Sequence, residues 1–180
     1  MFIFLTFFRI SSKKYRGNVA LFNGRPYTFV HVGGRETRTK GGSIENNEEA
    51  KVVAKFIDQL RTAAMKKGDK QWDKVSRIRV ISFYQAQVLL IARLLENRGM
   101  GNVVVSTVDS SQGSEADIVI VSFVRSKGDK VNSVGFLSDD RRLNVAITRG
   151  RDETGSHCVS SEKHDTILTL KITCQQPSIN

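Results

Sequence analysis

The sequence has few cysteines and no long apolar run. These two features argue against a disulfide-rich or zinc-binding protein and against a membrane-spanning one. Its two cysteines, Cys158 and Cys174, lie far apart. They have neither the paired spacing of a zinc site nor the number that a disulfide framework needs. The apolar opening MFIFLTFF is eight residues long, whereas a membrane span needs ~20. We therefore expect an intracellular protein, cytoplasmic or nuclear, without a membrane partner.

The opening segment also lacks the marks of a signal peptide. No basic residues precede it, and no small-residue cleavage site follows it. Two interpretations remain open for this segment. It is either a buried strand or a start that does not belong to the domain.

Positive charge is what the sequence has in excess. Its 180 residues include 28 Lys and Arg against 18 Asp and Glu, a formal net charge of +10. The length fits one domain with its own core. The charge favours an anionic partner, first a nucleic acid and second an acidic membrane surface. The alternative is a solvated basic surface without a specific partner.

Strands and helices alternate along the chain. Asn46 followed by Glu49 has the spacing of a capping box and starts a helix. Residues 117–124 are apolar almost throughout, which is typical of a strand that is buried on both faces of a parallel sheet. Residues 35–42 are expected to form a loop. Further strands are predicted over 27–32, 77–82 and 102–107, and further helices over 84–97 and 140–150. This order predicts an α/β fold with a doubly wound sheet.

Unusual polar residues follow the predicted strands at 82–87, 105–115 and 135–151, where open α/β sheets bind ligands. In the second segment, a turn at Gln112 and Gly113 would expose backbone N–H groups to a phosphate, and Glu115 would accept hydrogen bonds from a ribose. The other interpretation is an ordinary polar loop.

In the third segment Arg142 and Arg149 are seven residues apart and share one face of a helix. Such a face presents either solvated charges or a guanidinium that stabilises a developing phosphate charge.

Longer motifs now favour one family. VSTVDSSQGSEADIVIVSFVRS and GFLSDDRRLNVAITRGR resemble motifs V and VI of superfamily 1B helicases of the nonsense-mediated-decay and senataxin type. SFYQAQ is similar to their motif IV, and PYTFVHVGG with SIENNEEAKVV to the lead-in of their second RecA-like domain. The resemblance covers residues 24–151. It implies a three-layer RecA-like fold, of the P-loop NTPase type, with a mostly parallel sheet. It also implies an ATP-dependent helicase or translocase that uses ATP with Mg²⁺.

The resemblance also implies roles for single residues. Arg149 would be the catalytic arginine finger. Ser106 and Thr107 would contact nucleic-acid phosphates. Tyr84 lies at the interdomain cleft or is a plain packing residue. The nucleotide would be bound by Gln112, Gly113, Glu115, Arg142, Tyr84 and Gln87.

The sequence departs from the complete family pattern in two places. It lacks the phosphate loop and the acidic Mg²⁺ motif, which belong to the first RecA-like domain of such helicases. We therefore expect this chain to be inactive alone. Its expected partners are single-stranded RNA or DNA and a first RecA-like domain, which lies in the same chain or in another one.

After Arg151 the family continues with an apolar strand, whereas residues 152–161 are polar and turn-rich. Residues 166–173 form a substitute strand or nothing stable. The expected division is therefore an N-terminal extension over 1–23, the second RecA-like domain over 24–151 and an atypical tail over 152–180.

Two other functional hypotheses stay open. The chain is a basic module without enzymatic activity, which binds nucleic acid or docks on a helicase as a regulatory fragment. Alternatively, it is a truncated and inactive product.

Overall fold

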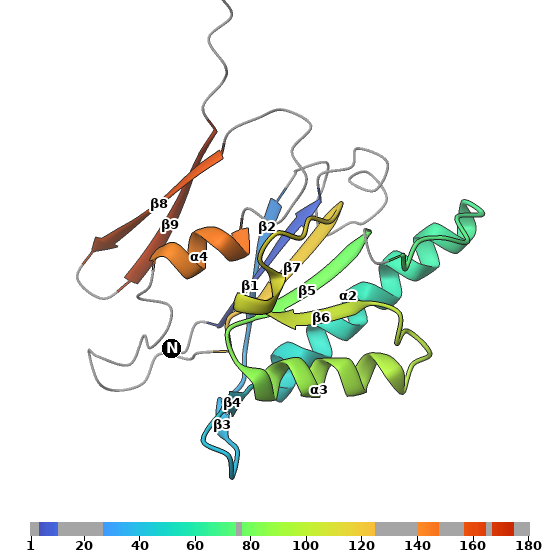
Figure 1. The fold of residues 1–180 in the computed structure, drawn as a ribbon, viewed down its shortest axis with the longest axis horizontal. Helices are drawn as coiled ribbons and strands as arrows, with labels where there is room; N and C mark the ends of the chain where they lie inside the picture. The colour runs from blue at the N-terminus through green and yellow to red at the C-terminus, as the bar shows by residue number, and fades with distance from the viewer. Residues whose placement is uncertain are drawn as a thin grey trace, which may run out of the picture.

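The computed structural model describes residues 4–10, 27–74, 77–124, 140–147, 157–164 and 167–174. The main sheet has five strands (Figure 1). From one edge to the other they are β2 (Tyr27–Val32), β1 (Phe4–Ile10), β7 (Ile118–Ser122), β5 (Ile78–Ser82) and β6 (Val104–Thr107). Strands β7, β5 and β6 run parallel, and β1 is antiparallel to both of its neighbours.

The parallel strands form the centre of the fold. Every residue of β5 and β7 is buried, as expected for strands that are covered on both faces. The strands predicted over 77–82, 102–107 and 117–124 are confirmed, each slightly shorter than the prediction. The α/β class is confirmed as well, and it is consistent with a RecA-like domain.

Helices cover the sheet on both sides. α2 (Asn47–Lys66) and α3 (Gln85–Glu96) lie on one side, which we call the first face. α4 (Asp140–Ile147) lies on the opposite side, the second face (Figure 1). The connection from β6 to β7, residues 108–117, also packs on the second face and contains the short helix η1 (Asp109–Ser111). The result is the expected arrangement of three layers.

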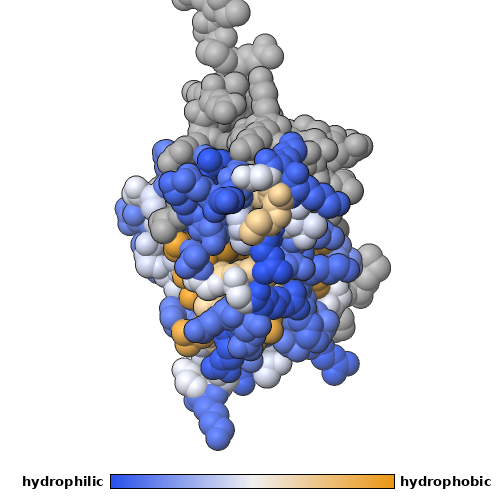
Figure 2. Space-filling view, turned by 90° about the vertical axis from the view of Figure 1, so that its right-hand side faces the viewer, coloured by the Kyte–Doolittle hydropathy of each residue, from blue (hydrophilic) through white to orange (hydrophobic). Residues whose placement is uncertain are grey.

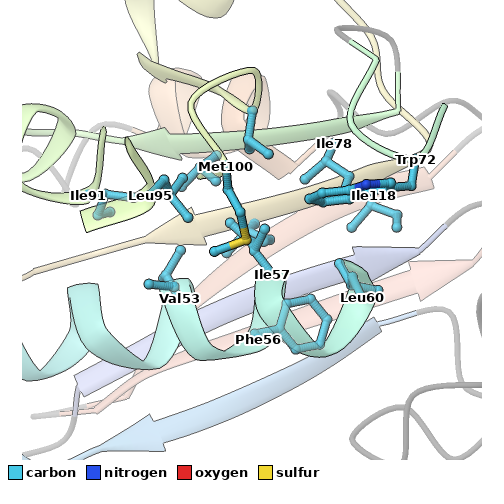
Figure 3. Packing of buried hydrophobic residues seen from close by; sticks show 14 of the residues in the cluster. Val53, Phe56, Ile57, Leu60, Trp72, Ile78, Ile91, Leu95, Met100 and Ile118 are labelled. Atoms are coloured by element: carbon cyan, nitrogen blue, oxygen red, sulfur yellow. The ribbon is translucent and has the colours of Figure 1, made fainter. Parts of the chain in front are cut away.

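The larger core lies between the first face and its two helices. Figure 3 shows Met100 directed toward Ile57 of α2, with Trp72 beside Ile78 and Ile118 of the sheet. Each large apolar side chain buried here stabilises the fold by about 1.5–3 kcal/mol. Trp72 is the only tryptophan of the chain and is 5% exposed. Its fluorescence therefore reports on this core.

Both ends of α2 follow local sequence signals. The Asn46 side chain accepts a hydrogen bond from the Glu49 N–H at 3.1 Å, which confirms the predicted N-cap. At the other end Gly68 has φ +68°, a left-handed conformation that favours glycine. The N–H of Asp69 bonds the Ala64 carbonyl at 3.0 Å and ends the helix.

From Phe4 onward the apolar opening forms β1, which confirms that this segment contains a strand. β1 pairs with β2 from Phe4↔Val32 to Arg9↔Tyr27 and with β7 from Thr6↔Ser122 to Ile10↔Ile118. Residues that the sequence assigned to an extension therefore supply a strand of the main sheet. The physical reason is that β7 has a backbone edge beside β1 whose N–H and C=O groups need partners.

Two small hairpins complete the described structure. Residues 35–42, expected as a loop, include β3 (Thr37–Arg38), which pairs with β4 (Ile44–Glu45). In the tail, β8 (His157–His164) pairs with β9 (Ile167–Cys174) in register from His157↔Cys174 to His164↔Ile167. The strand alternative for 166–173 is thus confirmed. β8 was missed, because its polar sequence does not show the apolar pattern of a strand.

The surface seen from the right-hand side of Figure 1 is mostly hydrophilic, with a few hydrophobic groups between the hydrophilic ones (Figure 2). Among the described residues no helix is long and apolar enough to cross a membrane. The same residues contain no group of three or more His, Cys, Asp or Glu that is arranged to hold a metal ion.

The position of β1 gives a first prediction. Thr6→Pro removes a backbone N–H in a strand that has neighbours on both sides, and proline inside a sheet costs a ladder hydrogen bond. We expect a loss of about 3 kcal/mol in the free energy of unfolding, measured by urea titration with Trp72 fluorescence. Thr6→Val keeps the N–H and is the control. Equal stability of both variants would place β1 outside the sheet.

Candidate functional site

Hydroxyl side chains end the three parallel strands. Ser82, Thr107 and Ser122 are the last residues of β5, β6 and β7, and both Thr107 and Ser122 are in register with Ser82. The Ser82 hydroxyl donates to the Ser122 carbonyl at 3.0 Å. This carboxyl edge is where open α/β sheets usually bind ligands. Here Ser82 and Ser122 are completely buried, and their hydroxyls form hydrogen bonds inside the domain.

Glu49 is the buried acid at this edge. Its side chain is 0% exposed, and its two carboxylate oxygens accept hydrogen bonds from the N–H groups of Phe123 at 2.9 Å and Val124 at 2.8 Å. Val124 has φ +69°, a conformation that is costly for a β-branched residue. The carboxylate therefore fixes the backbone where the chain leaves β7.

This arrangement corrects the expected capping box. In a capping box the acid three residues after the N-cap bonds back to the N-cap N–H. The Asn46 N–H instead donates to Gln87 Oε1 at 2.8 Å, which frees the Glu49 carboxylate for β7. The sequence spacing found Glu49 but assigned its side chain to the wrong partner.

Gln87 is fully engaged inside the domain. Besides accepting from Asn46, its Nε2 donates to the Asn46 carbonyl at 3.2 Å and to Ser122 Oγ at 2.9 Å. The side chain is 0% exposed. Gln87 would reach a nucleotide only by exchanging these bonds. In this structure it ties α3 to the start of α2 and to β7.

Tyr84 is the N-cap residue of α3 and is also buried. It belongs to the second-face core, together with Phe83 and Phe123, whose rings stack with centroids 5.8 Å apart. Its surroundings agree with the packing alternative that the sequence left open. Tyr84 and Gln87 thus lie at the carboxyl edge, within the protein.

The β6–β7 connection holds the exposed candidates. It runs from the carboxyl end of β6 to the amino end of β7, because parallel strands begin at the same edge. Gln112, Gly113 and Glu115 are exposed along it. Gly113 has φ +77°, and an added Cβ would meet open space. Glycine is therefore needed for backbone conformation, and the surface beside it is free for a ligand.

The start of this connection is held by local bonds. The Thr107 N–H donates to Ser110 Oγ at 3.0 Å, and the two hydroxyls are 2.8 Å apart. The Thr107 hydroxyl is thus shared with Ser110. The Oγ of Ser106, by contrast, is buried without a hydrogen-bond partner.

One ion pair joins α4 to this connection. Arg142 Nη2 donates to Asp109 Oδ2 of η1 at 2.7 Å. The structure therefore brings Arg142 to the segment that carries Gln112, Gly113 and Glu115. Arg149 lies outside the described residues. Asp109 was not singled out from the sequence, although it stands within the polar segment 105–115.

The sequence is similar to known proteins over most of its length. The AAA domain family matches residues 9–155. Helicase SEN1 of Saccharomyces cerevisiae is 35% identical over 132 residues, which are 70% of this chain and 6% of that protein. Regulator of nonsense transcripts 1 of Caenorhabditis elegans is 36% identical over 134 residues, 71% of this chain and 12% of that protein.

A further relative is the DNA polymerase alpha-associated DNA helicase A of Schizosaccharomyces pombe. It is 42% identical over 107 residues, 59% of this chain and 14% of that protein. This chain thus spans only 6% to 14% of the length of these three relatives.

The Glu49 contacts give a second prediction. Glu49→Ala leaves two buried N–H groups without an acceptor, and each such group costs about 1–3 kcal/mol. We expect a matching loss in the free energy of unfolding in urea. The control is Glu48→Ala, which removes an exposed ion pair with Lys51 and should cost less than about 0.5 kcal/mol. Similar losses for both variants would contradict the role of Glu49.

Proposed function

We infer that this chain works as one motor domain of an ATP-dependent helicase, because it belongs to the AAA domain family of superfamily 1B helicases. Within such an enzyme we assign residues 24–151 to the second RecA-like domain, and β1 completes its main sheet. The parallel strands and the layered helices support this assignment. So do the motifs in residues 105–151.

The ion pair between Arg142 and Asp109 is the observation that carries the proposal. It holds α4, the helix that precedes Arg149, against the segment of Gln112 and Glu115. The two side chains are 32% and 66% exposed, so the pair adds little to stability. Its consequence is geometric, since it sets motif V and motif VI side by side.

The exposed residues of the connection fit the edge of a nucleotide. Glu115 offers a carboxylate that would accept a hydrogen bond from a ribose hydroxyl, and Gln112 offers an amide. The open surface at Gly113 would let a phosphate approach the backbone N–H groups. ATP with Mg²⁺, held by a phosphate-loop domain, supplies the phosphoryl group that is transferred to water. Arg149 would stabilise the charge that develops on that group.

Nucleic acid is the second ligand in this proposal. The net charge of +10 supports attraction to single-stranded RNA or DNA, and Ser106 and Thr107 are hydroxyl donors suited to phosphates. We propose that opening and closing between the two motor domains moves this chain along the strand. We further propose an intracellular setting, since the two cysteines have no disulfide pattern.

The missing phosphate loop gives a third prediction. The purified 180-residue chain should release no phosphate from ATP above the background rate. Its sequence lacks the phosphate-loop motif that holds the β- and γ-phosphates in such enzymes. A phosphate-release assay with a phosphate-loop ATPase as the positive control checks this. Clear turnover by the chain alone would contradict the assignment to a second domain.

The arginine finger gives a fourth prediction. In a helicase that joins this domain to a phosphate-loop domain, Arg149→Ala should lower ATP turnover by about 10³–10⁵. Nucleic-acid affinity should change little, because the residue is assigned to the nucleotide. Arg151→Ala removes the same charge two residues away and serves as the control. If both variants turn over ATP like the wild type, Arg149 is not the finger.

A further inference from the structure

The β3–β4 hairpin projects from the domain and has a closed tip. Figure 1 shows it extending beyond the start of α3, away from the main sheet. In the tip, residues 39–43, the Thr39 N–H donates to the Ser43 carbonyl at 2.8 Å and the Gly42 N–H to the Thr39 carbonyl at 3.0 Å. Arg38 Nη1 adds a bond to the Gly42 carbonyl at 3.2 Å. These bonds hold the tip in one conformation.

The base of the hairpin is attached to the body of the domain. Ser43 Oγ accepts a hydrogen bond at 3.1 Å from the Ala86 N–H, one of the first N–H groups of α3, which have no partner within the helix. The next residue of the hairpin, Ile44, is 5% exposed and belongs to the second-face core. The position of the tip is therefore fixed by α3 and by the sheet.

The hairpin is basic, and its cations are exposed. Residues 35–43 contain three cations, Arg35, Arg38 and Lys40, and one acid, Glu36. All three cations are exposed. Within the described residues neither Arg35 nor Lys40 forms an ion pair. Their charges are therefore available to an anionic ligand.

Two glycines leave the tip open beside Lys40. An added Cβ at Gly41 or Gly42 would have no atom within 4 Å. Gly42 has φ +81°, a left-handed conformation that favours glycine, whereas Gly41 does not have a positive φ. Gly42 is thus needed for the shape of the tip, and no side chain at either glycine screens Lys40 from a ligand.

We propose that the hairpin binds the phosphate backbone of single-stranded nucleic acid through Arg35 and Lys40. Phosphates attract exposed Lys and Arg, and a preorganised backbone reduces the conformational freedom that is lost on binding. Residues 33–43 contain no aromatic side chain, so bases have no stacking surface here and the contact reads no sequence. The inference rests on the proposed function and extends it to residues 35–42, which lie between the two lead-in segments that resemble the family.

The position of the hairpin favours nucleic acid over an acidic protein as the ligand. The hairpin contacts the start of α3, which follows directly after the carboxyl end of β5. Thr107, proposed above as a phosphate contact, ends the neighbouring strand β6 at the same end of the sheet. One strand of nucleic acid that passes this end of the sheet can therefore contact both.

The test measures binding of the whole chain to a fluorescent single-stranded oligonucleotide at several salt concentrations. The hairpin variant combines Arg35→Gln with Lys40→Gln. Its affinity should fall about tenfold at low salt, and the slope of log affinity against log salt should fall in magnitude by about 1.4, two phosphate contacts. The control variant combines Lys66→Gln with Lys70→Gln, exposed lysines at and just beyond the far end of α2. It removes the same charge and should change the affinity less than about threefold.

Two glycine variants test the tip without changing its charge. Gly42→Ala places a Cβ on a left-handed residue and disfavours the observed tip, so the affinity should fall about twofold to fivefold. Gly41→Ala adds the same methyl group in open space, without a positive φ, and should bind like the wild type. Equal affinities of these two variants would show that the conformation of the tip is irrelevant, and the proposal is overturned.

Folding of each variant is checked by thermal melting of Trp72 fluorescence, which reports on the first-face core. The charge variants change exposed residues and should melt at the wild-type temperature. If the hairpin variant and the lysine control lose affinity equally, binding follows net charge alone. The hairpin proposal is then overturned, while the proposed function stands.

A polyglutamate peptide is the second probe and distinguishes nucleic acid from an acidic protein. If the hairpin variant weakens binding of the peptide and leaves oligonucleotide binding unchanged, the nucleic-acid assignment of the hairpin is overturned. A wild-type chain that binds no oligonucleotide would overturn this proposal together with the nucleic-acid part of the proposed function.

Discussion

The buried carboxylate of Glu49 holds together the parts of this domain that meet at the end of β7. It accepts hydrogen bonds from the N–H groups of Phe123 and Val124, the two residues that follow β7. Through Asn46 and Gln87 the same network reaches the starts of α2 and α3. Two helices and one strand thus share one set of buried hydrogen bonds, and none of them can shift without breaking several.

Because of this buried hydrogen-bond network, the buried polar residues at the carboxyl edge of the sheet are not available to a ligand. Ser82, Gln87 and Ser122 look like ligand-binding residues by position, yet their polar atoms bond one another in the interior. The residues that remain available lie on the second face, along the β6–β7 connection and beside α4. The Asp109–Arg142 pair joins these two segments. The residues proposed to bind the nucleotide therefore lie on the β6–β7 connection. This connection is attached to the carboxyl end of β5, because the Val108 N–H donates to the Ser82 carbonyl at 3.1 Å.

Much of the fold could be predicted from local patterns. The start of α2 is encoded by Asn46, its end by Gly68, and the parallel strands by continuous apolar runs. The place of β1 between β2 and β7 could not be predicted, because strand pairing depends on backbone groups far apart in the sequence. β8 was not predicted for a related reason: it is a strand because it pairs with β9, and its own polar composition does not indicate a strand.

The sequence indicated which segments form the candidate site, but it did not indicate which hydrogen bonds their side chains make. Sequence position cannot distinguish a glutamine that faces a ligand from Gln87, whose amide is satisfied inside the domain.

The position of Arg149 in a two-domain helicase, with bound ATP analogue and single-stranded nucleic acid, decides whether this chain supplies half of the ATP site. We predict that a crystal structure of this complex will show the Arg149 guanidinium within hydrogen-bond distance of the γ-phosphate position, with Glu115 at the ribose. An Arg149 that faces solvent in the closed complex, with the nucleotide held by the phosphate-loop domain alone, would contradict the claim that this chain supplies half of the ATP site.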